Sequence, residues 1–385
     1  MDKFKKNQLK NIARHKWTNP NALSATSAVF AFLVAIIGFV LLSALISLVL
    51  VLFPKLQEIG FYATNCIATV ILQLYILLIA CFFCKLNKVK LFSGADLGFK
   101  FDFSVCLPAL ALSVGTYLLI SPAHMQFATY IEEIKIALFG SGTTLPEMQQ
   151  TFTEILAVII FAFVVTPLLP AICEEALFRG FIMSGLREFG SLFAIFISGL
   201  LFALMHGNFS QMILQFILGC EMAFVVLITG NYFASVIMHF CNNLIAIIYA
   251  IAIEFFAMVS PTLSYALEAI LLLVGVALIS FAIIYYVKLS AYKKNEGHNK
   301  KKFAFYKPIK KSPCCLLQSG LPYEYCFAVE PNIVAKSNNK GFLFFAGGKF
   351  NKFKGRSNKV LFWVIFSISL FIAVGLIFFD FIMVG

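Results

Sequence analysis

The sequence predicts an all-α protein, a polytopic transmembrane helical bundle of about nine spans. Its composition is the first observation: 61% of the 385 residues are hydrophobic, 12% are charged and mean hydropathy is +0.92. Such a chain is solvated mainly by lipid. The second observation is the recurrence of apolar windows long enough, or nearly long enough, to cross a bilayer. These windows lie at 25–53, 61–84, 104–121, 153–173, 190–206, 210–229, 232–253, 263–287 and 360–384.

The charges between the windows orient them, because Lys and Arg are retained in cytoplasmic loops. Residues 1–17 carry six Lys and Arg against one Asp, and residues 85–100 add four Lys. Residues 122–154 hold four Glu and one Lys. We therefore expect a cytoplasmic N-terminus. The first window follows a polar stretch without a small-residue cleavage site, so we expect it to be a retained anchor.

The segment 288–359 falls on the same inner side and carries 16 Lys and Arg against three Glu. Because no zinc ligands, RNA-binding signature or helix-turn-helix pattern accompany this charge, we expect no nucleic-acid partner. Phe and Tyr residues interleave with its lysines, which suits a segment lying on anionic lipid headgroups. A solvated loop is the alternative. The Lys, Asn and Phe usage is typical of a bacterial chain, and we expect a multi-pass protein of the bacterial cell membrane.

The first informative motif is EExxxR, formed by Glu174, Glu175 and Arg179 at the end of the fourth window. At 100° per residue Arg179 lies about 40° around a helix from Glu175, the separation of an i, i+4 ion pair. Glu174 points about 100° away from Glu175. The spacing predicts that Glu175 is neutralised locally while Glu174 is available for chemistry. Pro167 and Pro170, just upstream, predict a kink in this helix.

Two further motifs place polar groups in apolar windows. Phe202 and His206 form an FxxxH pattern at the end of the fifth window, and His239 and Asn243 form an HxxxN pattern in the seventh. His239 and Asn243 share one helix face. A lone membrane His is usually an interhelical hydrogen-bond partner, but two of them with an Asn and an unpaired Glu indicate function. Glu221, in the sixth window, is either a participant in this site or an interhelical hydrogen-bond partner.

These residue types suit hydrolysis of an amide bond inside the membrane. Glu174 and His206 can hold and deprotonate a water. His239 and Asn243 can donate hydrogen bonds to the oxyanion that forms on the attacked carbonyl. Glu174, His206 and His239 could instead ligate zinc. Because Asn243 is a poor zinc ligand and a good oxyanion donor, we favour metal-free chemistry with no cofactor.

The three motifs, in this order and spacing, resemble the CAAX-processing and bacteriocin-immunity protease family (Abi), the intramembrane type II CAAX prenyl endopeptidase-like glutamic or metalloproteases. The resemblance covers roughly residues 150–250, where Phe216, Gly219 and Thr229 also follow the family pattern. It implies Glu174 as general base with His206 assisting, and His239 with Asn243 stabilising the oxyanion. It implies supporting roles for Glu175, Arg179 and Phe202. The substrate would be a membrane-associated protein or peptide.

The predicted organisation follows from these segments. It comprises a basic cytoplasmic N-terminal segment at 1–24, three spans and an outer loop at 25–150, an intramembrane protease core at 151–253, an eighth span at 254–287, a basic cytoplasmic loop at 288–359 and a last span at 360–385. If the fourth and fifth spans were straight, Glu174 and His206 would lie about 24 Å apart, from 16 residues at 1.5 Å each. We therefore expect helices that are offset, tilted or broken around a membrane-immersed, inward-facing cavity.

Two other functions compete with the protease. A non-catalytic membrane scaffold or bacteriocin-immunity protein would keep the motifs for helix packing, and would tolerate Glu174→Gln. A transporter would use Glu174 and the histidines as a proton relay, and would depend on a pH gradient without cleaving peptides.

Overall fold

The computed structural model describes residues 23–87, 101–139, 152–229, 231–295 and 358–383. Every regular element of these residues is a helix, and eight helices are long and apolar enough to cross a membrane. The predicted class, a polytopic helical bundle, is confirmed. Most of the basic segments 1–24 and 288–359 lies outside the described residues, so lipid contact by 288–359 stays a prediction.

The helices follow the chain in this order: α2 (Ala25–Leu52), η1 (Pro54–Ile59), α3 (Phe61–Leu86), α4 (Phe103–Phe139), α5 (Phe152–Ile160), η2 (Phe161–Val165), α6 (Thr166–Glu175), η3 (Ala176–Ile182), α7 (Met183–Leu186), η4 (Arg187–Phe189), α8 (Ser191–Met205), α9 (Met212–Thr229), α10 (Tyr232–Val259), α11 (Pro261–Asn295) and α15 (Lys359–Met383). Two starts are fixed by side-chain caps. Ser24 accepts a hydrogen bond from the Ser27 amide at 3.1 Å, and Asn231 accepts one from the Phe233 amide at 2.9 Å.

Three predicted spans differ from the structure. The third continues to Phe139 instead of ending at 121. The fourth window was predicted to end at 173, but the helical run from Phe152 continues past the EExxxR motif to Leu186. It continues because the charged side chains of the motif find their partners inside the protein. The predicted fifth span is only α8, whose 15 residues reach about 22 Å, less than the hydrocarbon thickness.

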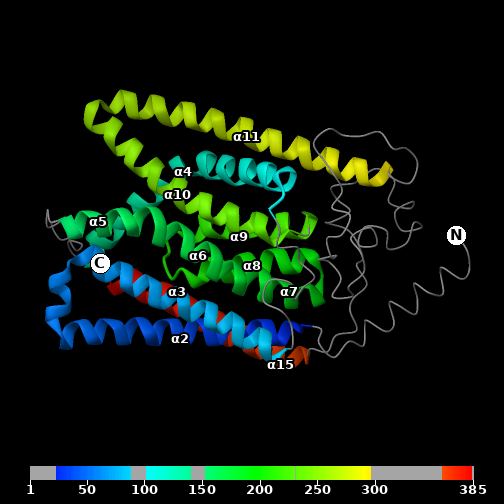
Figure 1. Cartoon of the computed structure of the whole chain (residues 1–385), viewed down its shortest axis with the longest axis horizontal. Coiled ribbons are helices and arrows are strands. Elements are labelled where there is room, and N and C mark those ends of the chain that lie inside the picture. The colour runs from blue at the N-terminus through cyan, green and yellow to red at the C-terminus, as the bar shows by residue number, and fades with distance from the viewer. Residues whose placement is uncertain (1–22, 88–100, 140–151, 230, 296–357, 384–385) are drawn as a thin grey trace, which may run out of the picture.

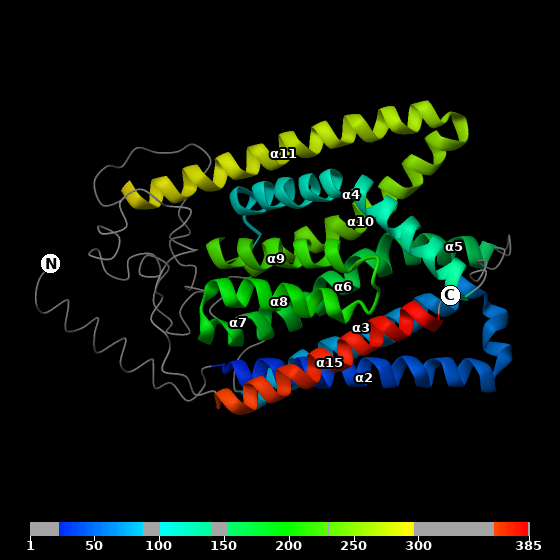
Figure 2. The same ribbon diagram turned by 180° about the vertical axis from the view of Figure 1, so that it is seen from behind.

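The helices are arranged so that α6 lies inside the bundle (Figure 1). It packs against α3 on one side and α10 on the other, while α4 joins α10 to α11 and α2 joins α3 to α15. In both views α8 and α9 are shorter than α2, α3 and α11, which extend further along the bundle (Figures 1 and 2). The loop between α8 and α9 therefore lies within the bundle.

Candidate active site

The helical run that carries the EExxxR motif contains two irregular turns. A π-helical turn, η2, precedes α6, and a second, η3, begins directly after Glu175. Pro170 lies inside α6, where it has no amide hydrogen to donate to the preceding turn. Such π-turns are frequent at functional sites. They change the direction of the side chains around the motif, while the helical run continues through Pro167 and Pro170. The kink expected there stays a prediction.

Glu175 and Arg179 form the i, i+4 ion pair that their spacing predicts. Arg179 Nη1 donates to Glu175 Oε1 at 2.7 Å, and both side chains are fully buried. Arg179 Nη2 also donates to the Gly219 carbonyl on α9 at 2.9 Å, and its guanidinium lies 4.6 Å from the centre of the Phe202 ring. The buried cation therefore joins η3 to both α8 and α9.

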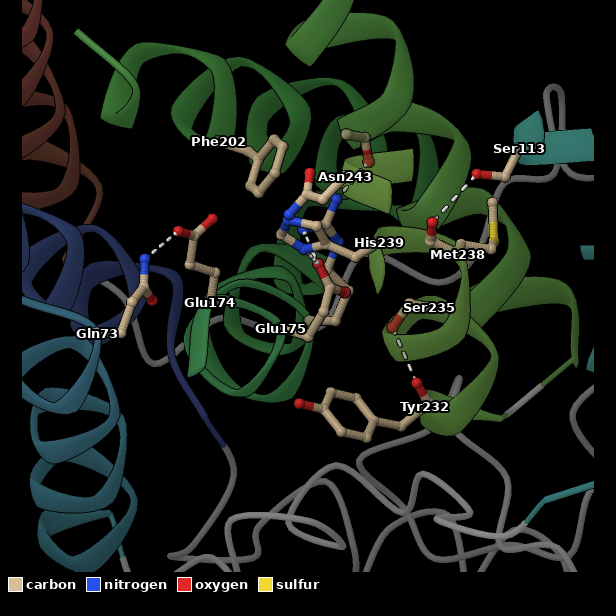
Figure 3. A network of polar contacts seen from close by, with 12 residues as sticks. Gln73, Ser113, Glu174, Glu175, Phe202, Tyr232, Ser235, Met238, His239 and Asn243 are labelled. Carbon is tan, nitrogen blue, oxygen red and sulfur yellow. Dashed lines mark hydrogen bonds and ion pairs between the residues drawn. The ribbon is translucent and has the colours of Figure 1, made fainter. Parts of the chain in front are cut away.

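Glu174 points the other way, toward α3 (Figure 3). Gln73 Nε2 donates to Glu174 Oε1 at 2.8 Å, and the Glu174 side chain is buried. None of the ion pairs of the described residues includes Glu174. Its second oxygen, Oε2, is buried without a protein hydrogen-bond partner in the same part of the chain. A buried carboxylate oxygen needs a donor, which a water molecule can supply.

A helical hairpin brings His206 back to the level of Glu174. Gly190, at a φ of +112° that favours glycine, ends the helical run from Phe152 and starts α8. Glu174 precedes Gly190 by 16 residues and His206 follows it by 16. The Phe178 and Phe202 rings, which are also equidistant from Gly190, meet at 5.2 Å between their centres. In this register Glu174 and His206 lie opposite each other across the hairpin, so the separation of about 24 Å for straight spans does not apply.

His239 and Asn243 approach the motif from α10. His239 Nδ1 lies 3.1 Å from Glu175 Oε1, and the His239 ring lies 5.5 Å from the ring of Phe202. Asn243 Nδ2 donates to the Thr166 carbonyl at 3.3 Å. Figure 3 shows Asn243 and His239 next to each other, above Glu175. All four residues predicted to be catalytic, and the three predicted to support them, therefore lie around α6.

The two histidines have the same hydrogen-bond pattern. His206 Nδ1 lies 2.9 Å from the Phe202 carbonyl, and His239 Nδ1 contacts the Glu175 carboxylate. Both partners are acceptors, so Nδ1 carries the proton in each ring. In a neutral ring Nε2 is then an acceptor. His206 can therefore accept a proton at Nε2 as it stands, whereas His239 can donate from Nε2 only as an imidazolium.

The motifs did not predict two groups that contact the site, the Gln73 side chain and the Thr166 carbonyl. Gln73 is a polar residue in the apolar window 61–84, which is the only sequence signal for it. The Thr166 carbonyl carries no sequence signal, since every residue has one. Two roles were predicted for Glu221, and the structure supports the interhelical hydrogen bond: Glu221 Oε1 accepts one from Thr116 on α4. The structure explains why a glycine suits position 219: a Cβ there would lie 3.1 Å from the Gly199 Cα on α8.

Zinc ligation by Glu174, His206 and His239 was the open alternative. The donor types suit zinc, and each imidazole has an acceptor on Nδ1, as metal-bound imidazoles usually do. However, no three His, Cys, Asp or Glu side chains within the described ranges form a group that could hold one ion. Zinc ligation and metal-free chemistry therefore both stay predictions for this site.

The comparison with protein families gives one match. Residues 155–245, 91 of the 385 residues, match the family described as type II CAAX prenyl endopeptidase Rce1-like. No curated protein and no solved structure matches the chain significantly. The matched segment begins in α5, ends in α10 and contains Glu174, His206, His239 and Asn243. The resemblance inferred from the three motifs is confirmed: residues 155–245 of this multi-pass helical membrane protein are similar to the Rce1-like type II CAAX prenyl endopeptidase family, a family of membrane proteases.

Proposed function

We propose that this chain is an intramembrane endopeptidase of the CAAX-protease type, which hydrolyses a peptide bond of a membrane-associated protein or peptide. The observation that carries the proposal is the different environment of two adjacent carboxylates. Glu175 is paired with a buried guanidinium, whereas Glu174 keeps Oε2 without a protein partner at the level of His206. An ionised carboxylate without a counter-ion is costly to bury, so its presence in a membrane helix indicates a chemical role.

Water activation would use the two acceptors on this side of the site. Glu174 Oε2 accepts one proton of the attacking water, while His206 Nε2 orients the water through its lone pair. The water oxygen bonds to the substrate carbonyl carbon and the carbonyl electrons move to its oxygen. Collapse of this intermediate breaks the C–N bond, and the leaving nitrogen receives the proton that Glu174 took up.

Oxyanion stabilisation would come from α10. Asn243 Nδ2 has two hydrogens and uses one on the Thr166 carbonyl, so the other can donate to the oxyanion. His239 Nε2 donates when its ring is protonated, and Glu175 at 3.1 Å stabilises that positive charge. Because the site is surrounded by helices, these donors act in a low dielectric, where each is worth more than in water.

The test is peptide-bond cleavage by the purified chain in lipid vesicles, with fragments identified by mass spectrometry of the membrane proteome. Glu174→Gln keeps the shape of the side chain but cannot take up the proton. We expect its cleavage rate to fall about 10²- to 10⁴-fold. Glu254→Gln, an exposed position on the same bundle, is the matched control and keeps full activity. Identical fragments from the wild type and Glu174→Gln would refute the proposal.

The metal-free part of the proposal is tested separately. We expect full cleavage activity after dialysis against a strong chelator, with no gain when zinc is restored. Loss of activity in the chelator and its return with zinc would overturn the metal-free mechanism and leave the protease assignment intact.

The proposed setting is a bacterial cell membrane, which the Lys, Asn and Phe usage supports. The N-terminus would be cytoplasmic, on the distribution of Lys and Arg between the spans. Segment 288–359 would contact anionic lipid on that side, without a nucleic-acid partner. Binding of the purified chain to added vesicles that contain anionic lipid, compared with neutral ones, tests the lipid contact.

A further inference from the structure

Gln73 is a buried amide in an apolar membrane helix, far in sequence from the motifs. It lies on α3, outside the family segment 155–245, and its side chain is 7% exposed. Within the described ranges its one hydrogen bond is the donation to Glu174 Oε1 at 2.8 Å, and its own Oε1 has no partner. An amide in such a place is costly unless it binds a strong partner, and a carboxylate is one.

We infer that Gln73 is a positioning residue for the carboxylate of Glu174, an inference that rests on the proposed function. The terminal torsion of a Glu side chain has a broad, roughly two-fold preference, so either oxygen could face the substrate. The hydrogen bond from Gln73 holds Oε1 toward α3. Oε2 is then the oxygen left to accept a proton from water.

The amide also suits both protonation states of the base. While Glu174 is ionised, the Gln73 NH2 group donates to it. After Oε2 has taken up a proton, Oε1 is a carbonyl oxygen and still accepts the hydrogen bond from Gln73. A Lys or Arg at this position would favour the ionised form of Glu174, and an ionised Asp or Glu would have no hydrogen to donate. Gln73 can therefore hold the carboxyl group in place throughout the cycle.

A structural role for Gln73, joining α3 to α6, predicts lost stability without a specific loss of turnover. Two variants separate the roles in the cleavage assay above. Gln73→Met keeps the length and removes the donor. Tyr75→Phe is the control, because it removes another hydrogen bond of α3, from the Tyr75 hydroxyl to the Val34 carbonyl at 2.8 Å, away from the site.

We expect Gln73→Met to lower kcat about 10- to 100-fold with KM changed less than about two-fold, the usual effect of losing a partner that orients a reacting group. Tyr75→Phe keeps kcat and loses similar thermal stability. Equal kcat for the wild type and Gln73→Met, or equal losses in the two variants, would overturn the inference.

If Gln73→Met does not fold, Gln73→Glu gives the same information. It keeps the shape, but it can donate to Glu174 only when one of the two carboxyls holds a proton. Its activity relative to the wild type should therefore rise as the pH falls, and a constant ratio across pH would contradict positioning. The two proposals fail separately: an active Glu174→Gln refutes the protease mechanism, whereas an inactive Glu174→Gln with an unimpaired Gln73→Met refutes only the role of Gln73.

Discussion

Removal of the Arg179 guanidinium is the sharpest test of how the site is held together. Arg179→Met keeps a long apolar side chain but takes the only guanidinium away from Glu175. The variant loses the 2.7 Å ion pair, the 2.9 Å hydrogen bond to the Gly219 carbonyl and the contact with the Phe202 ring. The Glu175 carboxylate stays fully buried, with His239 at 3.1 Å as its remaining partner.

The expected loss is large because the remaining charge is uncompensated. Removing one partner of a buried ion pair costs about 3–5 kcal/mol of unfolding free energy. Glu175→Gln should cost a similar amount, since it leaves Arg179 buried beside a neutral amide. Arg179→Met with Glu175→Gln removes both charges of this pair. We therefore expect the double variant to be less destabilised than the sum of the single variants, by a coupling of about 1–3 kcal/mol.

The assay is unfolding in mixed micelles by titration with SDS, followed by circular dichroism. Lys135→Met is the matched control, because the pair between Lys135 and Asp380 is longer, at 3.8 Å, and its Asp380 side chain is 28% exposed, so its loss should cost less than loss of the Arg179–Glu175 pair. Additive losses in the double variant, within about 0.5 kcal/mol, would show that the pair is not coupled and would refute the reasoning.

Two further predictions concern the helices around the site. Gly219→Ala should lower the unfolding free energy by about 1–3 kcal/mol, because its Cβ would lie 3.1 Å from the Gly199 Cα and 3.1 Å from Phe202. Gly375→Ala is the control: its Cβ would meet nothing within 4 Å, so it should cost nothing in the same SDS titration. Glu221→Gln should keep both cleavage rate and stability, because an amide oxygen can still accept a hydrogen bond from Thr116. Glu221→Leu should lower the unfolding free energy by about 1–3 kcal/mol. A large loss of kcat in a stable Glu221→Gln would instead place this residue in the reaction.

The sequence was sufficient for features that depend on local geometry. The starts of α2 and α10 agree with the predicted windows, which begin at 25 and 232, and the structure adds Ser24 and Asn231 as their caps. The pairing of Glu175 with Arg179, and the opposite direction of Glu174, follow from 100° per residue. Both arguments concern residues within one or two helical turns. The structure adds to them without changing them.

Features that depend on distant segments could not be predicted in this way. Hydropathy placed a span end at 173, because charged residues are expected to leave the membrane. In the structure Glu175 is instead neutralised by Arg179 and His239, so the helix continues inside the bundle. The partner of Glu174 lies 101 residues away on α3. No spacing rule joins two such positions. The inward-facing cavity stays a prediction.

The hairpin at Gly190 explains why the motifs lie so far apart in the sequence and yet form one site. Two antiparallel helices bring together residues that are equally distant from their turn, so Phe178 meets Phe202 and Glu174 reaches the level of His206. The register is then held from outside the hairpin. Arg179 binds the α9 carbonyl of Gly219, and Glu175 binds His239 of α10. The supporting residues therefore fix the alignment of three helical segments, which explains why a site for water chemistry needs a second, fully buried carboxylate beside the reactive one.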